Sequence, residues 1–182
     1  LTDIDPVMVF TVIGIILAAV FVAMVISILL SIFIWNPLEV GCQKFFINCK
    51  YGNAELGDIA YGFKNGYAHI GMIMFLRGLF TGLWMLLFII PGIVKSYEYM
   101  MIPYLLAEHP EMTRQEAFAE SKQMMDGNKW DAFVLDLSFI GWTLLGVCTF
   151  GILLVFYVEP YIYLTRAELY HALKNNNKSV EF

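Results

Sequence analysis

A long uncharged run near the start of the chain most strongly limits what it can fold into. No charged residue occurs from Pro6 to Leu38, a stretch longer than the roughly 20 residues that carry a helix across a bilayer core. A second uncharged run lies between Asp136 and Glu159. Because lipid satisfies no backbone polar group, an open chain crosses it only as helix. The sequence therefore predicts an all-α, polytopic integral membrane protein.

The composition agrees with this class and excludes some partners. Of the 182 residues, 59% are hydrophobic and 15% are charged, whereas soluble domains carry about 25% charged residues. The net charge is −5, and no basic stripe is present to neutralise phosphates, so we expect no nucleic-acid partner. The three cysteines and three histidines do not share a ligand spacing. We therefore expect reduced cysteines, no metal site and no cofactor.

One phrase of sequence occurs twice in the second half of the chain. It reads Trp-x-Leu-Leu, Gly-Ile, Pro-Tyr and Ala-Glu, and its copies begin at Trp84 and Trp142. Each copy passes from an apolar stretch, through a turn signal, into a second stretch that ends at a charge. Two helices joined by a short turn fit this order. We interpret the phrase as a duplicated helical hairpin.

The repeat and the apolar runs together predict about five membrane spans in one transmembrane domain, residues 1–182. The spans cover residues 7–35, 66–90, 93–108, 130–150 and 152–171. The third is short and polar, and it is assigned because its counterpart in the repeat is clearly apolar. Pro37 resembles Pro103 and Pro160, each of which closes a span near its cytoplasmic end. This likeness indicates a third copy of the repeat, so we expect a sixth helix before Leu1.

Two segments between the spans are amphipathic. Residues 38–65 mix lysines with aromatic residues, which is typical of an interfacial helix, here broken at residues 51–53. Thr113 and Glu116 have the spacing of a capping box, and Gly127 is a stop signal. The sequence therefore predicts a cytoplasmic amphipathic helix over residues 113–127. The candidate residues for docking a partner on its less polar side are Phe118, Met124 and Met125.

The basic residues indicate the orientation of the chain. Lysines and arginines mark cytoplasmic loops, and here they gather in residues 38–65, in residues 109–129 and after Leu164. These three regions share one side of the membrane only if each repeat is a hairpin. We therefore expect a cytoplasmic C-terminus and an N-terminal end outside.

Several stretches resemble one family of bacterial membrane proteins. They are residues 36–41, 90–108, 116–130 and 137–142, so the resemblance covers roughly residues 36–173. The family is known as domain of unknown function 975. The resemblance implies a multi-pass protein of the bacterial inner membrane with about six helices. It implies no established activity, substrate or catalytic residue.

Two charged residues lie inside predicted spans at similar depth. Arg77 precedes the first Trp of the repeated phrase, and Asp136 precedes the second by nearly the same distance. A lone charge is costly in lipid, so we expect the two residues to pair across the axis that relates the copies. The alternative is that Arg77 extends alone to the cytoplasmic interface.

Three further charged residues complete the candidate intramembrane polar site. Glu159 lies inside the fifth span, where a carboxylate is a candidate functional group; the alternative is a structural hydrogen bond to Tyr104 or Tyr161. Lys95 and Glu98 are one helical turn apart and are expected to pair near the outer turn. The whole candidate site consists of Arg77, Asp136, Glu159, Lys95 and Glu98. Tyrosines on the return helices either line a cavity for an amphipathic ligand or act as packing anchors: Tyr97, Tyr99, Tyr104, Tyr157, Tyr161 and Tyr163.

The sequence carries no catalytic triad, phosphate loop, zinc motif or haem motif. The favoured function is therefore a non-enzymatic membrane scaffold or accessory subunit that docks another membrane protein or a cytoplasmic partner through residues 113–127. The alternative is a small transporter or lipid-binding protein with a site between the hairpins. An intramembrane enzyme is the third and least favoured class. The sequence does not indicate an oligomeric state.

Overall fold

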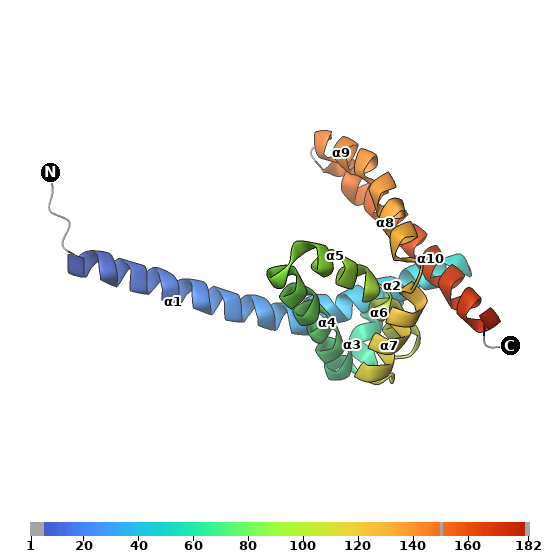
Figure 1. Ribbon diagram of the computed structural model, residues 1–182, viewed down its shortest axis with the longest axis horizontal. Helices are drawn as coiled ribbons and strands as arrows, with labels where there is room; N and C mark the ends of the chain where they lie inside the picture. The colour runs from blue at the N-terminus through green and yellow to red at the C-terminus, as the bar shows by residue number, and fades with distance from the viewer. Residues whose placement is uncertain (1–5, 150, 181–182) are drawn as a thin grey trace.

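The computed structural model describes residues 6–149 and 151–180, and every regular element within those ranges is a helix (Figure 1). In chain order the elements are α1 (Pro6–Leu30), the π-helix η1 (Ser31–Trp35), α2 (Asn36–Lys50), the 3₁₀ helix η2 (Leu56–Ala60), α3 (Tyr61–Lys64), α4 (Tyr67–Leu87), α5 (Ile89–Glu98), α6 (Ile102–Glu108), α7 (Arg114–Met125), α8 (Lys129–Ser138), α9 (Ile140–Cys148), the π-helix η3 (Leu154–Val158) and α10 (Glu159–Val180).

Within the described residues, three helical stretches are long and apolar enough to cross a membrane. They are Val7–Lys50, Tyr67–Leu87 and Lys129–Cys148. The first joins α1, η1 and α2 into one rod, and the third joins α8 and α9. These stretches are compatible with a membrane protein, while the count of five spans stays a prediction.

The expected single helix over residues 93–108 is instead two short helices. α5 ends at Glu98, and α6 begins at Ile102 after a turn. All six residues from Ile102 to Ala107 are buried in protein. The continuous helix expected over these residues is therefore wrong, because the backbone turns between Glu98 and Ile102. A membrane span at this place stays a prediction.

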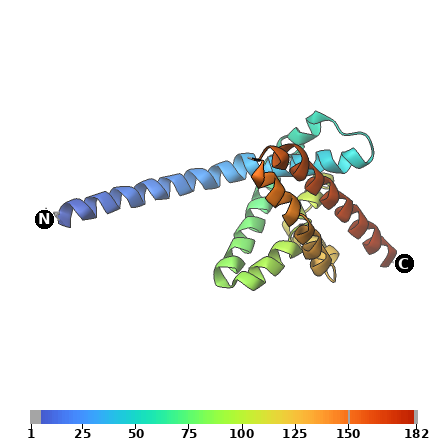
Figure 2. The same ribbon diagram turned by 90° about the horizontal axis from the view of Figure 1, so that it is seen from above.

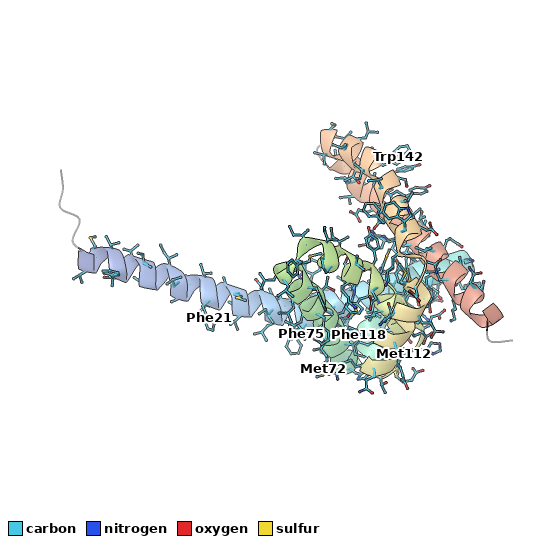
Figure 3. All side chains as sticks on the ribbon, viewed as in Figure 1. Phe21, Met72, Phe75, Met112, Phe118 and Trp142 are labelled. Atoms are coloured by element: carbon cyan, nitrogen blue, oxygen red, sulfur yellow. The ribbon has the colours of Figure 1, made fainter. Side chains whose placement is uncertain are left out.

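The buried core lies where α2, α6 and α10 meet, and three arms extend away from it (Figures 1 and 2). The arms are α1, the α4–α5 hairpin, and the hairpin formed by α8 and α9 with η3 and the first turns of α10. Phe21 of α1 and Trp142 of α9 lie far from the core (Figure 3). The side chains at the arm tips are largely exposed, Leu86 to 86% and Phe156 to 79%. The arms therefore carry the apolar surface that a bilayer would cover.

Three prolines mark the points where the arms enter the core. Pro37, Pro103 and Pro160 each occupy the second residue of α2, α6 or α10, and each follows an interruption of the α-helix. Proline has no N–H to donate, so the carbonyl four residues earlier loses its helical partner. For Pro37 that carbonyl belongs to Phe33, and the Tyr67 hydroxyl donates to it at 2.7 Å. The three prolines share a local setting, whereas the hairpin repeat itself stays a prediction.

The segment between α2 and α4 packs closely on α2. A Cβ on Gly41 would lie 1.9 Å from the carbonyl oxygen of Ile59, and a Cβ on Gly62 would lie 2.2 Å from that of Pro37. Only glycine permits these approaches. α2 ends at Lys50 and is followed by Gly52 with a φ of 69°. The break expected at residues 51–53 is therefore confirmed.

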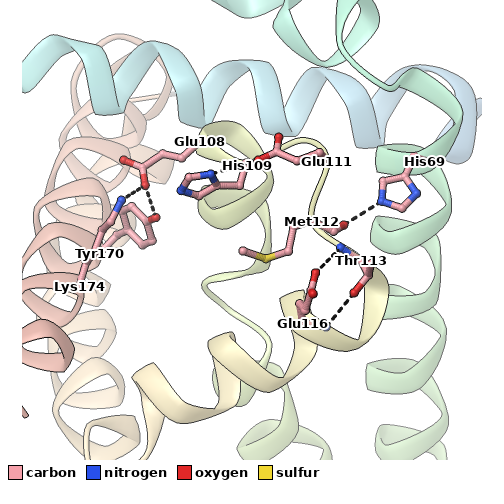
Figure 4. Close-up of polar contacts among 9 residues, drawn as sticks. All are labelled: His69, Glu108, His109, Glu111, Met112, Thr113, Glu116, Tyr170 and Lys174. Carbon is pink, nitrogen blue, oxygen red and sulfur yellow. Dashed lines mark hydrogen bonds and ion pairs between the residues drawn. The ribbon is translucent and has the colours of Figure 1, made fainter. Parts of the chain in front are cut away.

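α7 begins with the capping box expected from the sequence (Figure 4). The Glu116 N–H donates to the Thr113 hydroxyl at 3.4 Å, and the Thr113 N–H donates to the Glu116 carboxylate at 2.8 Å. These bonds hold the pKa of Glu116 below its ordinary value. Just before the box, the Met112 carbonyl lies 2.8 Å from Nε2 of His69 on α4. This contact fixes the start of α7 against the second arm.

Candidate intramembrane polar site

The third arm carries an ion pair between two of its own helices. Nη2 of Arg166 on α10 lies 2.9 Å from Oδ1 of Asp136 on α8. The Tyr97 hydroxyl on α5 donates to the other carboxylate oxygen of Asp136 at 3.1 Å. Both oxygens of Asp136 are therefore engaged, and the second and third arms meet at this carboxylate.

A second ion pair joins α2 of the core to the second arm. Nη1 of Arg77 on α4 lies 2.9 Å from Oε1 of Glu39 on α2. The expected pair between Arg77 and Asp136 is therefore wrong, and so is the alternative of an Arg77 without a protein partner. Arg77 lies on the side of α4 that faces α2, whereas Asp136 faces α10 and α5.

Tyr104 lies in the core between these two ion pairs. Its side chain is 2% exposed and stacks on Tyr170, with ring centroids 5.4 Å apart. Its buried hydroxyl has no hydrogen-bond partner in the part of the chain that the structure describes. Arg166, Glu39 and Arg77 all lie within electrostatic range of this hydroxyl. The ion pairs and Tyr104 thus form one polar cluster, contributed by five helices: α2, α4, α6, α8 and α10.

Glu159 is not part of this cluster. Its side chain is exposed on α10. No hydrogen bond or ion pair joins it to another described residue, so the expected bond to Tyr104 or Tyr161 is not formed. Tyr163, one helical turn further along α10, lies within its electrostatic range.

Lys95 and Glu98 form the expected ion pair, at 2.9 Å. The pair lies beside α7 and α8, and not near the tip of the hairpin as expected. Nζ of Lys129 on α8 also reaches the Glu98 carboxylate, at 3.3 Å, and the Ser121 hydroxyl on α7 donates to the Glu98 carbonyl at 2.8 Å. Glu98 therefore holds three helices together, and its side chain is only 5% exposed.

An open groove of about 310 Å³ begins at the Asp136–Arg166 ion pair. It runs along the third arm between α8–α9 and α10. Apart from the ion pair, its walls are formed by Phe139, Ile140, Thr143, Leu144, Val147 and Ile162. The groove thus has a charged end and an apolar body, an arrangement that suits a molecule with a polar head and a hydrocarbon tail.

The tyrosines have two different roles. Tyr97 lines a larger groove between α5 and α8, and Tyr163 lines a small pocket of about 260 Å³ beside Glu39. Tyr157 and Tyr161 stack on each other with ring centroids 6.4 Å apart, and Tyr161 also lines a pocket beside Phe46. Packing by tyrosines is therefore shown, while a cavity for an amphipathic ligand stays a prediction.

The candidate docking residues on α7 face inward. Met124 is 2% exposed and Met125 is fully buried. Phe118 packs edge-on against Phe80 and Tyr99, at centroid distances of 5.8 and 4.9 Å. These three side chains attach α7 to the rest of the protein, so their expected use as a partner-docking surface is wrong. An amphipathic pattern marks a face that is buried, but it does not say whether the same chain already covers it.

A separate contact closes the core near the C-terminal part of α10 (Figure 4). The Glu108 carboxylate accepts a hydrogen bond from the Tyr170 hydroxyl at 2.6 Å and forms an ion pair with Lys174. Burial favours a raised pKa for Glu108, but the hydrogen bonds from Lys174 and Tyr170 outweigh it, and the pKa is lowered. Glu108 belongs to α6, which lies outside the three membrane-length stretches.

Two members of the cluster were missed from the sequence, Glu39 and Arg166. Glu39 lies two residues after Pro37, and Arg166 lies six residues after Pro160. No sequence spacing connects them to Arg77 and Asp136, because the partners come from distant helices. No group of three or more metal-ligating side chains occurs among the residues that the structure describes.

The helices and the polar cluster define an all-helical protein, with three stretches of membrane-spanning length and partly buried charge pairs where its arms converge. The chain matches the family described as Protein of unknown function (DUF975) over residues 7–177. It belongs to this family, as the resemblance indicated. Comparison with curated proteins and with solved structures gives no match.

Proposed function

We propose that this protein is a non-enzymatic membrane protein that binds an amphipathic molecule in the groove between α8–α9 and α10. The polar head of the molecule lies at the Asp136–Arg166 pair, and its hydrocarbon tail follows the groove past Leu144 and Val147. The observation that carries the proposal is the position of this ion pair at one end of an otherwise apolar groove.

The state of the Arg166 guanidinium supports a head group with an acceptor oxygen. Its Nη2 binds Asp136, but its Nε is buried and has no hydrogen-bond partner among the described residues. An unpaired buried donor is costly. A head-group oxygen that displaces the side chains packed over Nε could satisfy this donor, and the exposed part of the guanidinium offers further N–H donors to a carbonyl, hydroxyl or phosphate oxygen. The pair is also partly open to a ligand, because the Arg166 and Asp136 side chains are 33% and 24% exposed.

The charge distribution supports one orientation in the membrane. The core and α7 carry most of the basic side chains, and the arms carry apolar surface. We therefore propose that the core and the C-terminus lie on the cytoplasmic side of a bacterial inner membrane, with the N-terminal end of α1 outside. The hairpins would then enter the bilayer from the cytoplasmic face.

A docking role for α7 is the second candidate. With its apolar side chains turned inward, such a role would use the outward polar face, which includes Arg114, Gln115 and Lys122. An exposed polar face is also the ordinary state of a surface helix. The groove therefore supports the ligand-binding proposal more strongly.

Native mass spectrometry of the full chain, extracted gently from a bacterial membrane, tests the proposal. We expect an amphipathic molecule that stays bound to the protein after the detergent is removed. A Val147→Trp variant fills the groove without touching the ion pair and should no longer carry the bound molecule. Val134→Trp is the matched control, because Val134 is exposed on the same arm but lies outside the groove. Retention of the same adduct by Val147→Trp would overturn the proposal.

A further inference from the structure

A second groove lies on another side of α8, between α5 and α8. It has a volume of about 410 Å³. Its walls include Ile90, Ile93 and Val94 of α5, with Trp130 and Phe133 of α8. Tyr97 separates it from the first groove, because Tyr97 lines the second groove while its hydroxyl binds Asp136 of the first.

Two lysines share one carboxylate in the ion pairs at one end of this groove. Lys129 lines the groove, and it shares the Glu98 carboxylate with Lys95. Two ammonium groups therefore face one carboxylate, which leaves one positive charge unmatched within the cluster. Asp126 and Asp131 are exposed nearby, and neither forms an ion pair with these lysines in the described chain. One negative charge would complete the cluster.

The same end of the groove has the features of a membrane interface. Lys129 is the first residue of the membrane-length stretch Lys129–Cys148. Trp130 beside it is 70% exposed, and exposed tryptophans gather at headgroup depth. The Nζ of Lys95 lies 5.7 Å from the ring centroids of both Trp84 and Tyr99. In a phospholipid the phosphate, the glycerol and the acyl chain follow one another in this order. The lysines would lie at the phosphate, the aromatic rings at the glycerol, and the apolar groove along the acyl chain.

We infer that the α5–α8 groove binds an anionic phospholipid, with its phosphate at Lys95 and Lys129 and an acyl chain along Ile93 and Phe133. The unmatched charge selects an anionic headgroup over a zwitterionic one. This site is independent of the ligand proposed between α8–α9 and α10, and it stands if that groove proves empty.

Tryptophan fluorescence tests the inference in the full chain. Trp35, Trp84 and Trp142 are replaced by Phe, which leaves Trp130 as the only tryptophan. The protein is placed in phosphatidylcholine vesicles, and brominated phosphatidylglycerol or brominated phosphatidylcholine is added as the quencher. We expect the brominated phosphatidylglycerol to quench Trp130 at about fivefold lower content, the ratio typical of one basic residue at an anionic surface.

Charge variants then change the preference in both directions. The preference is the ratio of brominated phosphatidylcholine to brominated phosphatidylglycerol that gives equal quenching. Lys129→Gln makes the cluster neutral and should reduce this ratio to about one. Glu98→Gln leaves two unmatched lysines and should increase the ratio. Lys64→Gln, at an exposed lysine of α3 outside the groove, is the matched control and should leave the ratio unchanged.

Three results would overturn the inference. Equal quenching by the two lipids would mean that the groove accepts any acyl chain. An absence of quenching would mean that protein, such as a second copy of the chain, covers the groove. A Lys129→Gln protein that behaves as Lys64→Gln does would mean that the lysine pair plays no part in selection.

Discussion

Arg166 and Asp136 lie on different helices of one arm, and their side chains meet at 2.9 Å where the groove begins. The contact closes the α8–α10 side of the hairpin at its core end, while Tyr97 ties the same carboxylate to the neighbouring arm. The ion pair therefore has a structural role as well as a place in the proposed ligand site. The two roles can be measured separately.

A double-mutant cycle measures the structural role. We expect Asp136→Asn and Arg166→Gln each to lower the free energy of unfolding. The double variant should lower it by less than the sum of the two single effects. Because the pair is partly exposed, the coupling energy should be about 1–2 kcal/mol, between the values for exposed and fully buried pairs. Unfolding of the four proteins in detergent micelles measures it. Strictly additive losses would show that the pair contributes no stability.

The Glu108 contact predicts a loss of stability in acid. Its folded-state pKa is lowered, so its contribution is fully present above the unfolded-state pKa and is lost as the pH falls through the folded-state pKa. We expect this part of the pH dependence to lie below the ordinary glutamate value of 4.5. Unfolding measured from pH 6 downward should show it in the parent protein. A Glu108→Gln variant with the same acid slope would contradict the assignment.

The packing of η2 on α2 predicts a strong effect at one glycine. A Cβ on Gly41 would meet the Ile59 carbonyl oxygen at 1.9 Å, so the backbone must move. We expect Gly41→Ala to lower the free energy of unfolding by about 1–3 kcal/mol, as overpacking does. Gly57→Ala is the control, because nothing lies within 4 Å of its Cβ position. Equal effects at the two positions would contradict the close approach.

The sequence predicted the local features of the fold well. The Thr113–Glu116 capping box and the Lys95–Glu98 pair depend on residues one turn apart, and both are confirmed. The family was also recognised from its motifs. These features require no knowledge of how distant helices pack.

The errors concern which surface an apolar helix faces. Met124 and Met125 are expected to dock a partner from the sequence, but they are part of the core. The Arg77–Asp136 pairing failed for a related reason, because residues at equal depth need not lie on facing sides of their helices. Depth can be estimated from the sequence, whereas rotation about the helix axis depends on packing.

A high-resolution structure of the full chain in lipid nanodiscs tests the proposed ligand site directly. We expect elongated density along Leu144 and Val147, with its head within hydrogen-bonding distance of the Arg166 guanidinium. A groove closed by its own side chains, or occupied by a helix from a second copy, would contradict it.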